Sequence, residues 1–379
     1  MFLLIFILIL VALIWVHELG HFTAAKLFGI RVDEFAIGFP PRLLTVRWGE
    51  TQYSFNLLLV GGYVRIHGED GAVDERRLPA GRQARDKRSM ASKPRLIQAG
   101  VIVAGVAMNL IVGWLALSAG FMAGMAATPD SSAFGELRDA RTTVTQVIPQ
   151  SPAELSGMMA GDQIQRLETG AKKQLEPPVT AESVTRFIGE HQNESLIVYT
   201  LRPSTKLGTG KGEEKVFIAK PAEGFAAGKK VLGISMADIG VLQLPPHLAL
   251  LQGAISAKQL TVSTAVGLGA FFSQLFRGAA DWGSVAGPIG IAGAGASAVQ
   301  NGFAAAAFIT ALISINLAII NLIPIPGLDG GRLLIIIVEG VLRRPVSQKI
   351  ITTLSLAGFA LVILLMLVVT YHDIAKLVG

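Results

Sequence analysis

Residues 1–25 read MFLLIFILILVALIWVHELGHFTAA, an unbroken apolar run that leads into two histidines and a glutamate. An apolar stretch of about 20 residues can cross a bilayer as a single helix. A signal peptide would have a basic start and a cleavage site of small residues, and this stretch has neither. We therefore predict a retained membrane helix that continues through His17 and His21 to about Ala25.

The composition agrees with a membrane protein. Hydrophobic residues make up 51% of the 379 residues, charged residues make up 16%, and the mean hydropathy is +0.53. Soluble domains carry about 25% charged residues. Three further apolar stretches, at about 96–126, 303–323 and 350–371, are long enough to cross a bilayer. We expect an α-helical polytopic membrane protein with about four transmembrane helices.

The distribution of Lys and Arg predicts the orientation of these helices. The net charge is +6, and the basic residues gather between the first two spans and in the short link between the last two. Such loops remain in the cytoplasm, so both termini should lie outside it. Basic residues that flank membrane helices account for the positive net charge, so the predicted partner of these residues is membrane lipid. No nucleic-acid partner is predicted.

The chain divides into four expected segments. Residues 1–126 hold the first two spans and, between them, a cytoplasmic segment whose alternating pattern predicts β-hairpins near the membrane. Residues 137–240 have a soluble composition with short strands and form an extracytoplasmic domain. Residues 245–300 suggest an amphipathic helix on the outer surface, and residues 301–379 hold the last two spans.

The extracytoplasmic segment contains a recognisable pattern of its own. Val147–Ala153, followed by Gly157 and Gly161–Ile164, resembles a PDZ domain. That α/β fold binds extended peptides by adding a strand to a sheet edge, so a peptide partner is expected here. The alternative is a small α/β domain without a ligand.

The first helix carries a motif that points to a metal. His17-Glu18-Leu19-Gly20-His21 fits H-E-x-x-H, which places both imidazoles on one helix face with a glutamate beside them. Two such histidines can bind one Zn²⁺, and the glutamate can take a proton from the attacking water. The chain has no cysteine, which excludes zinc sites built from thiolates and cysteine nucleophiles. The alternative is a polar helix end that matches the motif by accident.

A catalytic zinc site needs a third protein ligand. The candidate is Asp329, in Asn321-Leu322-Ile323-Pro324-Ile325-Pro326-Gly327-Leu328-Asp329-Gly330-Gly331. This stretch follows the third span at its cytoplasmic end, the same depth at which His17 and His21 lie. The alternative is a turn aspartate or a cap of the next helix.

These motifs together resemble the site-2 protease family of intramembrane metalloproteases, in its bacterial group of regulator-of-sigma-E proteases. The resemblance covers nearly the whole chain, although many relatives carry two PDZ domains and this chain has one. The motifs occur in the order His17–His21, Glu34–Pro41, Gly61–Val64, the PDZ-like segment, Gly287–Ala292 and Asn321–Gly331.

The resemblance implies specific roles. His17, His21 and Asp329 would bind Zn²⁺, and Glu18 would be the catalytic base. Asn321 would hold the substrate or stabilise the oxyanion, and its alternative is a hydrogen bond between helices. The hairpins would align an unfolded substrate strand, and the PDZ-like domain would filter substrates that another protease has already shortened.

We therefore expect a zinc metalloendopeptidase of the bacterial inner membrane that cleaves transmembrane segments in regulated intramembrane proteolysis. An anti-sigma factor or a remnant signal peptide would suit the family as substrate. Two other readings remain open: a membrane-embedded zinc hydrolase of a non-protein substrate, and an inactive scaffold that binds partners through its PDZ-like domain.

Overall fold

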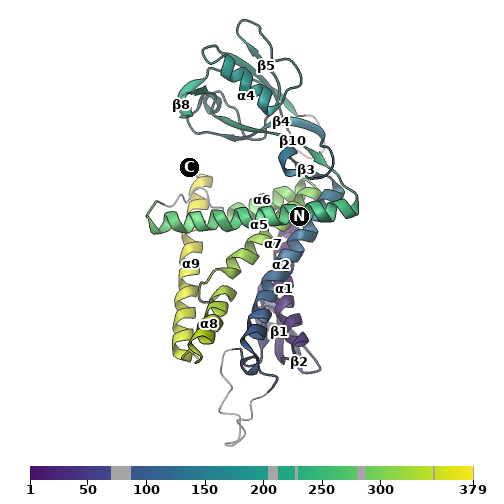
Figure 1. Ribbon diagram of the computed structural model, residues 1–379, viewed down its shortest axis with the longest axis vertical. Coiled ribbons are helices and arrows are strands. Elements are labelled where there is room, and N and C mark those ends of the chain that lie inside the picture. The colour runs from purple at the N-terminus through teal and green to yellow at the C-terminus, as the bar shows by residue number, and fades with distance from the viewer. Residues whose placement is uncertain (70–86, 204–211, 227–228, 280–286, 345, 379) are drawn as a thin grey trace, which may run out of the picture. The chain divides into compact units, whose positions relative to one another are not determined.

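A computed structural model describes residues 1–69, 87–203, 212–226, 229–279, 287–344 and 346–378 (Figure 1). These residues form two compact units. We call residues 1–120 with 249–379 the helical unit and residues 121–248 the inserted unit. Each unit is described by itself.

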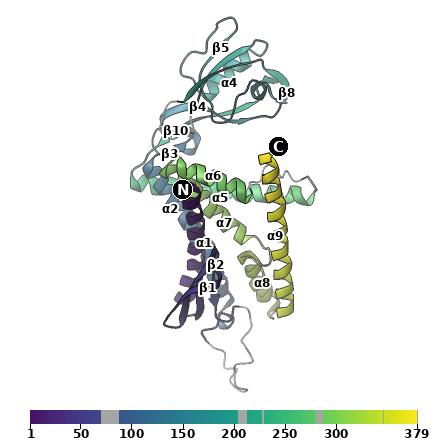
Figure 2. The same ribbon diagram turned by 180° about the vertical axis from the view of Figure 1, so that it is seen from behind.

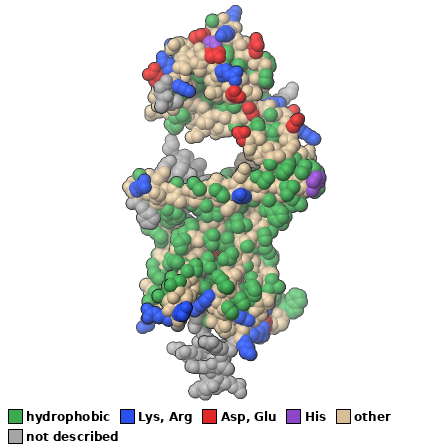
Figure 3. Space-filling model, in the orientation of Figure 1, with side chains coloured by type: hydrophobic (Ala, Val, Ile, Leu, Met, Phe, Trp, Pro, Cys, Tyr) green, Lys and Arg blue, Asp and Glu red, His purple; other side chains and the backbone are tan. Residues whose placement is uncertain are grey.

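Four helices in the described part of the chain are long and apolar enough to cross a membrane. They are α1 (Phe2–Leu27), α2 (Arg95–Ala123), α7 (Phe303–Leu322) and α9 (Gln348–Val378). The four predicted spans are thus confirmed, with ends that differ by a few residues. Figure 3 shows hydrophobic side chains over much of the visible face of the helical unit, with Lys and Arg gathered at its lower end.

Three further helices belong to this unit. The segment expected as one amphipathic helix contains two, α5 (Pro246–Phe276) and α6 (Pro288–Gln300), and α5 lies crosswise to α1 and α9 (Figure 2). The link between the last two spans contains α8 (Asp329–Leu342). The sequence pattern did not separate α8 from its surroundings, because its apolar residues are interrupted by glycine, Arg332 and Glu339.

The expected hairpins are a single long hairpin of β1 (Val32–Trp48) and β2 (Thr51–Ile66). Its register is irregular, so that Phe35 lies opposite both Val64 and Tyr53. The first half of β1 is therefore flanked by both halves of β2. After the hairpin, residues 70–86 lie outside the described residues, and a 3₁₀ turn covers Met90–Ser92.

A buried carboxylate holds the parts of the hairpin together. Glu34 is only 2% exposed, and its Oε1 accepts hydrogen bonds from Ser54 Oγ at 2.6 Å and Arg42 Nη2 at 3.0 Å. Arg65 Nη2 lies 3.5 Å from Glu34 Oε2, which also accepts a hydrogen bond from Arg42 Nη2 at 3.1 Å. Because a buried charge is tolerated only when paired, this cluster fixes how the two strands fold over each other.

The inserted unit is built on a six-stranded sheet in the order β3-β10-β4-β5-β6-β7. Its strands are β3 (Met125–Ala127), β4 (Arg138–Val147), β5 (Gln163–Thr169), β6 (Leu196–Arg202), β7 (Glu213–Ala219) and β10 (Ile234–Leu242), beside a small hairpin of β8 (Ala222–Ala226) and β9 (Lys229–Val231). Helix α4 (Ala181–Glu190) buries Val184, Phe187 and Ile188 in the core. This architecture agrees with the predicted inserted PDZ-like domain.

The PDZ-like pattern begins with a very short helix. This helix is the single turn α3 (Pro152–Leu155). It ends because Gly157 takes a φ of +89°, a left-handed conformation that residues other than glycine rarely adopt.

The turn after this helix contains a partly buried ion pair. Asp162 accepts hydrogen bonds from Arg202 Nε at 2.7 Å and Nη2 at 2.8 Å, and these bonds raise the pKa of Arg202.

The motif Gly287–Ala292 begins α6. The buried Asp373 carboxylate, from α9, accepts hydrogen bonds from the backbone N–H of Gly287 at 3.1 Å and of Gly290 at 2.9 Å. A Cβ added to Gly287 would lie under 3 Å from Asp373 and Val369. The motif therefore joins the start of α6 to the last span.

We expect Asp373→Ala to lower the free energy of unfolding by about 1–2 kcal/mol, because two N–H groups at the start of α6 lose their acceptor. Thermal unfolding of the full chain in detergent measures this change. Asp130→Ala, at an exposed aspartate of a 3₁₀ turn, is the control and should leave unfolding unchanged. Equal unfolding curves for both variants would contradict the capping role.

Candidate metal centre

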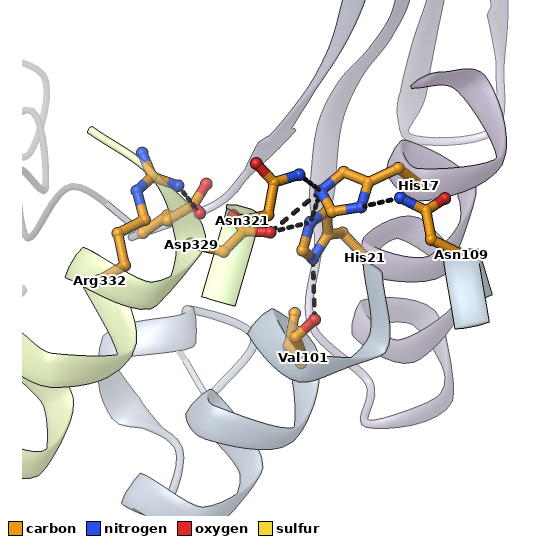
Figure 4. A network of polar contacts seen from close by, with 8 residues as sticks. His17, His21, Val101, Asn109, Asn321, Asp329 and Arg332 are labelled. Atoms are coloured by element: carbon orange, nitrogen blue, oxygen red, sulfur yellow. Dashed lines mark hydrogen bonds and ion pairs between the residues drawn. The ribbon is translucent and has the colours of Figure 1, made fainter. Parts of the chain in front are cut away.

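Three side chains from distant parts of the chain converge in the helical unit (Figure 4). His17 and His21 lie one turn apart on α1 and are 5% and 8% exposed. Their Nε2 atoms are 3.2 Å apart, and they lie 3.0 and 3.2 Å from Asp329 Oδ2. The structure thus brings together the two histidines and the aspartate that the sequence motifs predicted to share a metal.

Asp329 reaches the histidines because the chain turns sharply after α7. This helix ends at Leu322, and Ile323 is extended ahead of Pro324 and Pro326. Asp329 is the first residue of α8, whose N-cap is Leu328, so Asp329 does not occupy the cap position that was the alternative to a ligand. A Cβ on Gly330 would lie under 3 Å from the carbonyls of Leu322 and Ile323. Glycine at this position therefore allows the start of α8 to pack closely against the end of α7.

The Nδ1 atom of each histidine also has a partner. His21 Nδ1 lies 2.9 Å from the carbonyl oxygen of Val101, which can only accept a hydrogen bond. His21 Nδ1 therefore carries a proton, and in the neutral ring Nε2 presents a lone pair to the site. His17 Nδ1 lies 3.2 Å from the side-chain amide of Asn109.

This geometry fits a bound cation. Asp329 Oδ2 is buried against the two Nε2 atoms, yet among the described residues no N–H or O–H is aligned to donate a hydrogen bond to it. With a lone pair on each Nε2, three electron-rich atoms would point at one another, and a cation between them would replace this repulsion by attraction. All lie within 4.8 Å of one another, and two imidazoles with one carboxylate are a ligand set of catalytic zinc sites.

The two other predicted site residues lie close by. Asn321 Nδ2 is 3.2 Å from His17 Nε2, the nitrogen that faces Asp329. Glu18 follows His17 on α1, and its Cγ lies 3.5 Å from the position that a Cβ on Gly62 would take. Strand β2 of the hairpin therefore passes directly beside the Glu18 side chain.

The sequence analysis did not identify the contribution of α2 to this site. Val101, Gly105 and Asn109 are four residues apart and share one face of the helix. A Cβ on Gly105 would lie under 3 Å from both histidine rings. Asn109, a buried polar residue within an apolar span, was the available signal, because such residues are normally functional.

A cavity of about 410 Å³ lies between α1 and the hairpin. Its walls are predominantly apolar, and the lining residues with polar side-chain groups are Trp15, Tyr53 and Ser54. The walls are formed by Trp15, Val16 and Leu19 of α1 and by Phe35, Ile37, Leu44, Val46, Tyr53, Ser54 and Phe55 of the hairpin. Its α1 wall adjoins Glu18 in the sequence, so apolar groups bound there would lie near the metal centre.

Comparison with known proteins identifies the family of the chain. Residues 5–365 match Peptidase family M50. The chain belongs to peptidase family M50. This family is that of the site-2 proteases, so the resemblance drawn from the motifs is confirmed.

Relatives named zinc metalloprotease RasP are similar to this chain along nearly their entire length. Zinc metalloprotease RasP of Shouchella clausii is 31% identical, and the comparison covers 99% of both chains. The RasP proteins of Oceanobacillus iheyensis and Geobacillus kaustophilus are each 28% identical, covering 98% of this chain and 98% and 97% of their own. The chain is therefore a multi-pass membrane protein and an M50 zinc metalloprotease with a candidate His-His-Asp metal site.

Proposed function

We propose that this M50 protease cleaves transmembrane segments of other membrane proteins. The observation that supports this most is the location of the converging side chains. His17 and His21 lie within α1, and Asn321 lies within α7, both of which are long and apolar enough to cross a membrane. The family itself implies membrane-protein substrates, and a site on these helices would meet them within the lipid.

We assign roles to five residues. His17, His21 and Asp329 would hold Zn²⁺, which when bound activates a water molecule and polarises the scissile carbonyl. Glu18 would accept the proton of that water and deliver it to the leaving nitrogen. The Nε2 of His17 cannot serve both the metal and Asn321, so the Asn321 amide would be released to donate to the carbonyl oxygen of the substrate.

The hairpin would supply the substrate in an extended form. A helical peptide shields its amides, so cleavage requires a locally unwound segment, and strand pairing can hold one. Strand β2 runs beside Glu18 at Gly62, and the adjacent cavity accommodates large apolar side chains. The strand favours a peptide over a lipid ester as the substrate, because strand pairing holds a backbone, whereas an apolar cavity suits either molecule.

The positive residues support a cytoplasmic placement of the hairpin and of the α8–α9 turn. In Figure 3 Lys and Arg gather at the end of the helical unit that holds these segments. We propose a bacterial inner-membrane protein with both termini outside the cytoplasm. Its PDZ-like domain would then meet a peptide or filter substrates there, and an anti-sigma factor or a remnant signal peptide would suit the site.

Purified protein tests this proposal when offered a transmembrane peptide and, separately, a lipid ester. We expect cleavage of the peptide alone, loss of cleavage with a chelator, and recovery on addition of Zn²⁺. Hydrolysis of the ester alone would establish the hydrolase with a non-protein substrate. A chain that binds no zinc and cleaves neither would be the inactive scaffold.

A further inference from the structure

One face of α2 lies against both histidines of the candidate metal centre (Figure 4). Val101, Gly105 and Asn109 follow one another at intervals of four residues, the same interval that separates His21 from His17. Val101 accepts a hydrogen bond from His21, Gly105 leaves space beside both rings, and Asn109 contacts His17. Each histidine on α1 therefore has its own partner on α2.

We propose that Asn109 is a positioning residue that fixes the tautomer and ring orientation of His17 by accepting a hydrogen bond from its Nδ1–H. This inference rests on the proposed function, because it takes His17 as a metal ligand through Nε2. A neutral imidazole that binds a metal through Nε2 carries its proton on Nδ1. The partner of His17 Nδ1 must then be an acceptor, as the Val101 carbonyl is for His21.

The Asn109 side chain has one acceptor, Oδ1. The two ends of an amide exchange places when the side chain turns, and the hydrogen-bond partners decide which orientation holds. The structure places Nδ2 at 3.2 Å from His17 Nδ1 and leaves Oδ1 buried without a partner in the described residues. With a proton on Nδ1, two donors would face each other, so the metal-bound state requires Oδ1 at this position.

The surroundings of Asn109 are suited to such a role. Asn109 is fully buried, so water cannot replace its amide as the partner of His17. Its backbone carbonyl accepts a hydrogen bond of 2.8 Å from Ser314 Oγ of α7, which is also fully buried. The turn of α2 that carries Asn109 is therefore fixed by a second span. Removal of a partner that orients a ligating histidine in this way typically lowers metal affinity about 10- to 100-fold.

Two substitutions of similar shape separate this role from packing. Asn109→Leu removes the acceptor, whereas Asn109→Asp retains it. We expect the zinc affinity of the full chain in detergent, measured against a competing chelator, to fall about 10- to 100-fold in Asn109→Leu. In Asn109→Asp it should equal or exceed that of the unchanged chain. Ser118→Ala, which removes another buried polar group of α2, is the matched control and should not change the affinity.

The Nδ1 proton of His17 gives a second readout, which packing alone would not alter. In ¹⁵N-histidine spectra of the zinc-loaded chain, we expect a downfield, slowly exchanging Nδ1–H that disappears in Asn109→Leu and persists in Asn109→Asp. The His17→Gln variant assigns this signal. An unchanged chain that lacks the signal, or equal zinc affinity in the Leu and Asp variants, would overturn the role of Asn109. If the unchanged chain bound no zinc at all, the proposed function would fail instead.

Discussion

The Glu18→Gln variant should lose about 100- to 10,000-fold in cleavage rate while retaining the zinc content of the unchanged chain. The amide has nearly the same shape as the carboxylate but cannot accept a proton, and general-base catalysis contributes a factor of this size. The zinc content should persist because His17, His21 and Asp329 form the converging set without Glu18. Cleavage of a transmembrane reporter and metal analysis of the same preparation measure both quantities.

The control for this variant is Glu50→Gln. Glu50 lies between the hairpin strands, where it pairs with Lys26 at 2.7 Å and with Arg88. Hydrogen bonds from Lys26 and Arg88 lower the pKa of Glu50, so it is charged at neutral pH, but unlike Glu18 it is not adjacent to a histidine of the candidate metal centre. Its variant should cleave at the normal rate. Normal cleavage by Glu18→Gln would instead remove Glu18 from the mechanism.

The second large effect is expected at Gly105. In Gly105→Ala the added Cβ would lie under 3 Å from the imidazoles of His17 and His21. Because this Cβ belongs to a helix packed between other spans, the rings must move, and we expect zinc affinity to fall about 100-fold or more, with cleavage lost in proportion. Metal titration and the reporter assay on the full chain measure both effects.

Gly100→Ala is the matched control on the same helix. A Cβ there would lie 3.8 Å from Phe28 Cε2, an ordinary contact. Alanine also favours the helix over glycine by about 1 kcal/mol, so this variant should be at least as stable as the unchanged chain and fully active. Wild-type zinc affinity in Gly105→Ala would show that α2 does not approach the histidines this closely.

The sequence was most informative where a local pattern determines the structure. The four spans follow from the length of their apolar runs, and the shared face of His17 and His21 follows from their spacing. Asp329 could be placed beside them because the third span brings it to a similar depth. These inferences needed no knowledge of how the helices pack.

The features that were missed depend on packing. The Val101 partner of His21 is a backbone carbonyl, which every residue has, so no residue type marks it. Gly105 has its role only because α2 passes close to α1. The irregular pairing of Phe35 with both Val64 and Tyr53 depends on the Glu34 cluster, whose members lie far apart along the strands. Asn109 alone carried a signal, as a polar residue in an apolar span.

The candidate metal centre joins His17, near the start of the chain, to Asp329, which is preceded by α7. During synthesis, therefore, the first helix reaches the lipid long before the carboxylate that completes its ligand set has been translated. A growing or prematurely terminated chain lacks the third ligand and should remain inert toward neighbouring membrane proteins. Peptidase activity would then arise only after α7 has been inserted and the start of α8 has been translated, with no separate inhibitor required.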